Sequence, residues 1–300
     1  MKDGQLKGYI QVFIAGSLWG TVGVFSMTLD SMGVDSLLAG FLRVGFAFFI
    51  MLALTIGRFG ISSLKIGPKA IFGCILVGLV SHGMFNAFYM TAVLKVGVTT
   101  ASVMLRIAPV FTVISSVLLF RERITGTKGL SLVINIIGCM MAVAGGAIGE
   151  GGFSILGILC GLGAGASYGM LAIFVKLIPD DVTPFVISTY GYFFAGLFLM
   201  FMCKPWDSVD VLTLPSLSVG FLFALVPTAL GYVIYYSGVQ KITESSKIPV
   251  IASCETVVAA IIGVLIYHDY LGIVNITGII LVLASIALMS RKTGEETLSE

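Results

Sequence analysis

Charged residues are scarce in this sequence. Asp, Glu, Lys and Arg make up only 11% of the 300 residues, whereas hydrophobic residues make up 58%. In an ordinary soluble domain about a quarter of the residues are charged, so this composition excludes a water-soluble protein. The formal net charge is only +2, and we expect no nucleic acid among the partners.

Recognisable catalytic and metal-binding motifs are also lacking. The chain has no Gly-rich phosphate loop, no HExxH helix and no nucleophile elbow. The five cysteines show neither metal-site spacing nor a disulfide framework, and the loops are too short to hold an ATP-hydrolysing domain. We therefore expect no enzyme activity, no catalytic residues, no metal and no cofactor. The cysteines are Cys74, Cys139, Cys160, Cys203 and Cys254.

Long apolar runs are abundant, by contrast. Ten of them approach or exceed the ~20 residues that a helix needs to cross a bilayer. They show no two-residue alternation, so they predict helices rather than the strands of a barrel. The sequence therefore predicts an all-α membrane protein with ten transmembrane helices. The ten runs are 9–29, 37–56, 71–94, 98–120, 129–147, 153–178, 184–202, 216–239, 247–267 and 272–290.

The second half of the chain repeats the first. Residues 73–139 align without a gap on residues 220–286, at an offset of 147. Pairs of identical residues include Gly73 with Gly220, Tyr89 with Tyr236, Val110 with Val257, and Leu118 with Leu265. We therefore divide the chain into two five-helix units, 9–147 and 153–290.

The loop charges indicate that the two units are inserted in opposite directions. Arg121, Arg123 and Lys128 follow the fourth run, whereas the matching loop after the ninth is His268-Asp269-Tyr270. Loops rich in Lys and Arg stay on the cytoplasmic side. We predict cytoplasmic N- and C-termini in a multi-pass protein of the plasma membrane, the inner membrane of a bacterium. Inverted repeats of this kind are typical of alternating-access transporters.

Three charged residues lie within predicted spans: Arg43, Arg106 and Glu255. An Arg at the centre of a membrane helix costs about 2.5–3.5 kcal/mol, so these residues are expected to face the protein interior. One interpretation is that an Arg holds a substrate carboxylate while Glu255 holds an amine or a coupling proton. The other is that Glu255 neutralises Arg43 or Arg106 in a pair that only locks the bundle. Arg43 is nearest to a membrane surface, and its side chain is long enough to reach the interface.

Aromatic and amide residues accompany these charges. Asn86 and Tyr89 are three residues apart and share a helix face, as do Tyr232 and Tyr235. Aromatic walls with a few polar groups suit an organic, partly apolar small molecule. The predicted substrate-binding residues are Trp19, Arg43, Asn86, Tyr89, Arg106, Tyr168, Tyr232, Tyr236 and Glu255.

Glycine and proline positions predict how the helices pack and bend. Gly157, Gly161, Gly165 and Gly169 recur every four residues, which predicts one face along which another helix approaches closely. Three prolines lie beyond the first residue of a predicted span, and a proline inside a helix removes a backbone hydrogen bond and bends the helix. These are Pro109, Pro227 and Pro249.

The chain resembles the EamA-type transporters of the drug/metabolite transporter superfamily. The resemblance rests on Ser17-Leu18-Trp19-Gly20, Arg43, Ala108-Pro109, Arg121-Glu122-Arg123 and Glu255, and it covers residues 9–290. This chain has Glu255-Thr256 and His268-Asp269 where family members often have Glu-Pro and Gly-Glu. The resemblance implies a central cavity bounded by spans one to four and six to nine, with spans five and ten at the periphery. It also implies transport of small metabolites, frequently amino acids.

We predict a secondary transporter that exports amino acids or related metabolites across the lipid bilayer. An exporter of lipophilic cations, bound by Glu255 and the tyrosines, is an alternative. A membrane scaffold or lipid-handling protein is an alternative of another class. A dry core with all three charges paired favours the scaffold, and a wet cavity that holds them apart favours transport.

The predicted topology can be tested by cysteine labelling. On a cysteine-free background, Ser208→Cys is expected to react with an impermeant thiol reagent in whole cells. Ser63→Cys is expected to react only after permeabilisation, because its loop is predicted to be cytoplasmic. Labelling of both positions from outside would contradict the inverted repeat.

Overall fold

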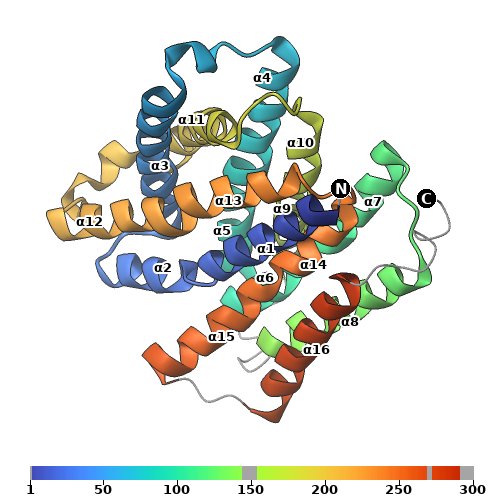
Figure 1. The fold of residues 1–300 in the computed structure, drawn as a ribbon. Helices are drawn as coiled ribbons and strands as arrows, with labels where there is room; N and C mark the ends of the chain where they lie inside the picture. The colour runs from blue at the N-terminus through green and yellow to red at the C-terminus, as the bar shows by residue number, and fades with distance from the viewer. Residues whose placement is uncertain (1, 144–153, 269–271, 291–300) are drawn as a thin grey trace.

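The computed structural model describes residues 2–143, 154–268 and 272–290 (Figure 1). The predicted boundaries at 147 and 153, and Asp269 with Tyr270, lie outside the described residues. Within those residues, ten helical stretches are long and apolar enough to cross a membrane, and no β-strand is present. The prediction of an all-α protein with ten spanning helices is confirmed.

Four spans are single helices, and six are built from two or three helical segments. The single-helix spans are α3 (Ser36–Phe59), α8 (Gly126–Val143), α11 (Pro184–Cys203) and α16 (Ile273–Ser290). Spans one, four and six are α1 (Lys2–Trp19) with α2 (Val22–Ser31), α6 (Val98–Leu105) with α7 (Ala108–Phe120), and α9 (Ile155–Gly169) with α10 (Leu171–Leu177). Span three is α4 (Pro68–Ile75), a π-helical segment (Leu76–Met84) and α5 (Phe85–Val96). Span eight is α12 (Leu214–Phe223), a π-helical segment (Ala224–Leu230) and α13 (Gly231–Val239). Span nine is a 3-10 turn (Ser245–Lys247), α14 (Ile248–Ala252) and α15 (Cys254–Tyr267). Short 3-10 turns at Ile61–Leu64 and Pro205–Val211 lie in the loops after α3 and α11.

The irregular points of the two halves correspond. Arg106, between α6 and α7, and Ser253, between α14 and α15, are 147 positions apart. Arg121 and His268, which end α7 and α15 in the left-handed conformation, are separated by the same interval. The two π-helical segments match at this offset as well. The orientation of the halves in the membrane stays a prediction from loop charge.

The prolines account for only some of these irregularities. Pro109 lies in the first turn of α7, directly after the break, and Pro227 lies inside the second π-helical segment. Pro249 lies in the first turn of α14, where a missing amide hydrogen costs nothing. Span nine instead breaks at Ser253, four residues further on.

The two halves of the chain are packed into each other. The most extensive helix contacts are α8 with α16, α3 with α11, α5 with α9, and α1 with α13. Each pair takes one helix from either half. Figure 1 shows α8 and α16 side by side at the edge of the bundle. Large apolar side chains such as Leu118, Leu265 and Ile273 are more than 70% exposed, as expected for surfaces that face lipid.

The predicted glycine face makes close contacts along its whole length. A Cβ atom at Gly157 would lie 2.7 Å from Lys95 Cβ, and one at Gly161 would lie 2.4 Å from Met104 Sδ. At Gly169 the added carbon would lie 2.4 Å from the backbone oxygen of Ala108. Span six therefore touches spans three and four where only glycine leaves room.

We expect Gly169→Ala to destabilise the protein by about 1–3 kcal/mol, because a backbone oxygen cannot move aside as a side chain does. Gly45→Ala is a matched control in α3, where nothing lies within 4 Å of the added carbon. The measurement is the thermal unfolding midpoint in detergent. Equal midpoints for the two variants would remove the packing argument.

Candidate functional site

The two helix breaks in spans four and nine place opposite charges face to face. Arg106 lies at the carboxyl end of α6, and Glu255 lies in the first turn of α15. A helix dipole favours a cation at its carboxyl end and an anion at its amino end. Both charges therefore lie at the helix ends that stabilise them. Broken helices with charged groups at the break are typical of transporter binding sites.

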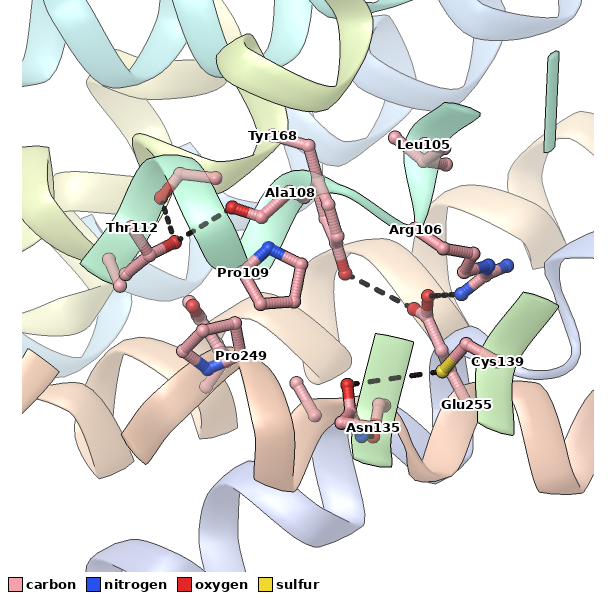
Figure 2. A pocket seen from close by; sticks show the side chains of 15 residues that line it. Leu105, Arg106, Ala108, Pro109, Thr112, Asn135, Cys139, Tyr168, Pro249 and Glu255 are labelled. Carbon is pink, nitrogen blue, oxygen red and sulfur yellow. Dashed lines mark hydrogen bonds and ion pairs between the residues drawn. The ribbon is translucent and has the colours of Figure 1, made fainter. Parts of the chain in front are cut away.

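A small hydrogen-bond network joins these residues (Figure 2). Nη1 of Arg106 donates to Oε1 of Glu255 at 2.7 Å and to Oγ1 of Thr256 at 2.9 Å. The hydroxyl of Tyr168 donates to Oε2 of Glu255 at 3.1 Å. Nε of Arg106 is enclosed without a partner in the described part of the chain. The ion pair uses one nitrogen of the guanidinium and is not the bidentate form.

A cavity of about 30 Å³ adjoins this network. A single water molecule needs about 10–15 Å³ of such space, so the cavity is too small for a metabolite. Spans four, five, six, eight and nine line it, with side chains that include Arg106, Asn135, Cys139, Tyr168, Tyr235 and Glu255. The family resemblance implied that span five is peripheral, but α8 contributes Asn135 and Cys139 to this wall.

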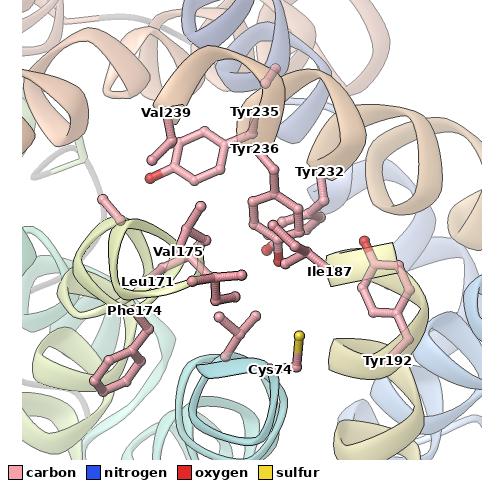
Figure 3. Close-up of a cluster of buried hydrophobic side chains, with 14 of the residues drawn as sticks. Cys74, Leu171, Phe174, Val175, Ile187, Tyr192, Tyr232, Tyr235, Tyr236 and Val239 are labelled. Atoms are coloured by element: carbon pink, nitrogen blue, oxygen red, sulfur yellow. The ribbon is translucent and has the colours of Figure 1, made fainter. Parts of the chain in front are cut away.

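An aromatic cluster covers one side of the network. The Trp19 ring lies 4.7 Å from that of Tyr232, 4.8 Å from that of Tyr235 and 6.2 Å from that of Tyr168. Figure 3 shows Tyr232, Tyr235 and Tyr236 gathered on one stretch of α13. Nε1 of Trp19 is enclosed and, in the described structure, has no hydrogen-bond acceptor. Trp19 and Tyr232 are therefore neighbours of the charged pair.

Three predicted site residues form contacts away from the cavity. Tyr236 bonds through its hydroxyl to Nε2 of His82 at 2.9 Å, and Nδ2 of Asn86 donates to the carbonyl of His82 at 2.6 Å. The Tyr89 hydroxyl pairs with that of Ser102 at 2.8 Å, between α5 and α6. The Tyr236 and Tyr89 bonds join span three to spans eight and four, whereas the Asn86 bond lies within span three.

Arg43 is separate from the other two charges. It is 8% exposed and belongs to none of the ion pairs found among the described residues. Its guanidinium carbon lies 5.3 Å from the centre of the Phe223 ring. The sequence left open a pairing of Glu255 with Arg43 or Arg106, and in the structure the partner is Arg106. Arg43 is buried and does not reach the interface.

Sequence reasoning omitted several residues of the cavity wall. Asn135 bridges span five to the break in span nine, because its Nδ2 donates to Oγ of Ser253 at 2.6 Å and to Oγ of Ser285 at 2.9 Å. Asn135 was not among the predicted substrate-binding residues, and Cys139, one turn later, was noted only as one of five cysteines. Tyr235 was recognisable as one of three tyrosines in a single stretch of span eight.

Comparisons with known proteins agree with this architecture. The model of the EamA-like transporter family matches the chain twice, at residues 6–144 and 155–291. An uncharacterized transporter of Archaeoglobus fulgidus is 27% identical over 291 residues, covering 95% of this chain and 97% of that protein. The uncharacterized transporter YwfM of Bacillus subtilis is 22% identical over 305 residues, with 98% of each chain covered.

A solved crystal structure shares the fold. It superposes with a TM-score of 0.80 at 17% identity and covers 94% of this chain and 95% of its own. The family match and the named relatives, together with ten apolar spanning helices, identify a multi-pass membrane transporter. The chain belongs to the EamA-like transporter family.

Proposed function

We propose that this protein is a secondary transporter that exports amino acids or related small metabolites by alternating access. Its central site is the group formed by Arg106, Tyr168 and Glu255. The observation that carries the proposal is a charged pair at two helix breaks, one from each half of the chain. Glu255 is the group that binds the amine of the substrate or carries a coupling proton.

The geometry of the pair suits exchange with a ligand. Glu255 accepts one hydrogen bond on each oxygen, and Arg106 donates to it from a single nitrogen. A substrate ammonium group can therefore replace Tyr168 or Arg106 at either oxygen. The cavity is too small to admit a substrate, so entry requires the surrounding helices to separate.

The charges are arranged partly as expected for a scaffold and partly as expected for a transporter. Arg106 and Glu255 are paired, as in a scaffold, but Arg43 stands apart and a cavity adjoins the pair. Trp19, Tyr232 and Tyr235 beside Glu255 also favour a cationic ligand, since aromatic faces attract cations. An exporter of lipophilic cations is therefore the second candidate.

A cluster of charged residues holds the end of the bundle that is predicted to face the cytoplasm. We call it the inner cluster; its members are Glu122, Lys128, Glu244, Ser245, Ser246 and Lys247. The carboxylate of Glu122 accepts hydrogen bonds from the amides of Ser245 at 2.6 Å and Ser246 at 3.1 Å. Glu244 pairs with Lys128 and, at 2.6 Å, with Lys247. Glu122 and Lys128 belong to the first half and the other members to the second, so the bonds of Glu122 and the Lys128–Glu244 pair tie the two halves together at this end.

The lowered pKa of Glu244 makes the inner cluster sensitive to acid. Partial burial by itself would raise the pKa of the carboxyl group, but hydrogen bonds from Lys128 and Lys247 and their charges outweigh it and lower the pKa. A lowered pKa in the folded protein means that the charged form contributes stability at neutral pH. That contribution is lost as the pH falls through the lowered pKa, below the ordinary value of 4.5.

We therefore expect Glu244→Gln to lower the thermal unfolding midpoint at pH 7 and to reduce its dependence on pH between 5 and 3. The matched control is Asp210→Asn, an exposed carboxylate near the other end of the bundle. It should leave both quantities unchanged. Identical pH profiles for Glu244→Gln and the unmodified protein would show that the inner cluster does not stabilise this state.

The central test is a double-mutant cycle of Glu255→Gln and Arg106→Gln. Each single change leaves a buried charge without its partner and should cost about 3–5 kcal/mol of stability. The double variant should recover most of that loss, since no unpaired charge remains. All three variants should fail to transport if the pair belongs to the binding site.

Transport is measured by metabolite profiling of cells with and without the overexpressed protein, followed by uptake into proteoliposomes. Stability is measured separately, by thermal unfolding in detergent. Near-normal transport by the stable double variant would end the functional assignment and leave a purely structural pair.

A further inference from the structure

Arg43 is a buried cation without an anionic partner in the described structure. It lies seven residues after the start of α3, about 10 Å along a helix that rises 1.5 Å per residue. The ion pairs among the described residues are Arg106 with Glu255, and Lys128 and Lys247 with Glu244. None of them includes Arg43. Its Nε is fully enclosed and, among the described residues, meets no acceptor.

The contacts that Arg43 does make leave its burial poorly compensated. The attraction of a guanidinium to an aromatic ring is smaller than the cost of placing an Arg inside a membrane helix. Phe223 also offers no hydrogen-bond acceptor to the donors of the side chain. A binding site for an anion gives a reason to keep such a residue, because the anion supplies both the charge and the acceptors.

Three ionisable side chains near Arg43 are not anions. Its positive charge acts on His82, Tyr192 and Tyr232, and none of these side chains is ordinarily negative at neutral pH. Tyr192 donates its hydroxyl to the carbonyl of Thr228 at 3.0 Å, and His82 is bonded to Tyr236. The Tyr232 hydroxyl takes part in none of the hydrogen bonds found among the described residues, so it is a second donor near Arg43.

The aromatic cluster connects this region to Glu255. The Tyr232 ring lies 4.7 Å from the His82 ring on one side and 4.7 Å from the Trp19 ring on the other. Trp19 in turn contacts Tyr168, which donates its hydroxyl to Glu255. An apolar surface therefore lies between a cation without a partner and a carboxylate. A molecule with a carboxylate, an apolar body and an amine has matching groups in the same order.

We propose that Arg43 binds the carboxylate of the transported molecule, and that the substrates are carboxylates with an apolar or aromatic body. The assignment rests on the proposed transport function and deepens it. Arg106 then orients Glu255, and Arg43 recognises the anionic group. An amine on the substrate binds at Glu255.

Three related probes test the carboxylate and the amine of such a substrate separately. 4-(2-Aminoethyl)benzoate carries a carboxylate and an amine at opposite ends of an aromatic body, benzoate carries only the carboxylate, and phenethylamine carries only the amine. Binding is measured on the full chain in lipid nanodiscs by calorimetry and by the shift of the unfolding midpoint. Arg43→Gln removes the charge, and Arg43→Lys keeps a charge without the planar fork of the guanidinium. Arg58→Gln is the matched control, since Arg58 also lies over aromatic rings, at 5.6 Å, but is exposed near the opposite end of α3.

We expect Arg43→Gln to weaken both carboxylate probes at least tenfold and to leave phenethylamine binding unchanged. Arg43→Lys should give intermediate affinities, and Arg58→Gln should have no effect. Without ligand, Arg43→Gln should unfold at the same or a higher temperature, because it removes a buried charge that has no partner. A purely structural Arg43 would give the opposite result, a lower midpoint with unchanged relative affinities.

Two results would overturn the assignment. One is that neither carboxylate probe binds the unmodified protein, and the other is that Arg43→Gln weakens phenethylamine as much as it weakens the carboxylates. If phenethylamine alone binds, and Glu255→Gln abolishes that binding, the Arg43 site is refuted while the transport function stands as cation export. Loss of the transport function itself would show instead in the double-mutant cycle of Arg106 and Glu255.

Discussion

The interior of a bilayer offers no hydrogen-bond partner, and this constraint decides where Arg106 and Glu255 lie. Each charge is costly alone, so the chain brings them within 2.7 Å of each other and supports them with Tyr168 and Thr256. The breaks at Arg106 and Ser253 divide spans four and nine into shorter helices whose ends favour these charges. The local fold of both spans therefore suits a charged pair inside a membrane.

This pairing requires the two halves of the chain to approach closely, and glycine makes that approach possible. Gly16 and Gly20 of span one lie against the region of the Ser253 break, where a Cβ atom would lie 2.6 Å from the Ala252 oxygen or from Val258 Cβ. Gly165 and Gly169 do the same for span six against Ala108 and its neighbours. Helices one and six therefore press directly on the two breaks. The hydrophobic effect does not drive helices together in lipid, so this contact depends on the close fit of the helix surfaces.

Hydropathy was sufficient to predict the ten spans, because each must exclude polar residues over the thickness of a membrane. The glycine face was also predictable, since its four-residue spacing has one geometric meaning. The π-helical segments and the break at Ser253 were not, because they follow from packing between segments that are distant in sequence. Three prolines were visible, yet span nine breaks four residues after Pro249, and spans one and six break without any proline.

Sequence alone also could not predict which of the site residues contact one another. Sequence alone predicted that Arg43, Arg106 and Glu255 face inward, but it could not choose the partner of Glu255, because both arginines carry the same cost and the same chemistry. The separation of Tyr89 and Tyr236 from the cavity was equally hidden, since each tyrosine has several hydrogen-bond partners within reach of its helix. Which polar groups meet is decided by the packing of whole helices.

Span nine connects the two polar regions of the molecule. Its first turn belongs to the inner cluster, where Glu122 caps the amides of Ser245 and Ser246, and Glu255 follows Lys247 by eight residues, about 12 Å along a helix. The short helix α14 lies between them and ends at Ser253, which Asn135 holds from span five. The inner cluster and the charged pair are therefore joined by one short helix of span nine, which ends at the break that Asn135 holds.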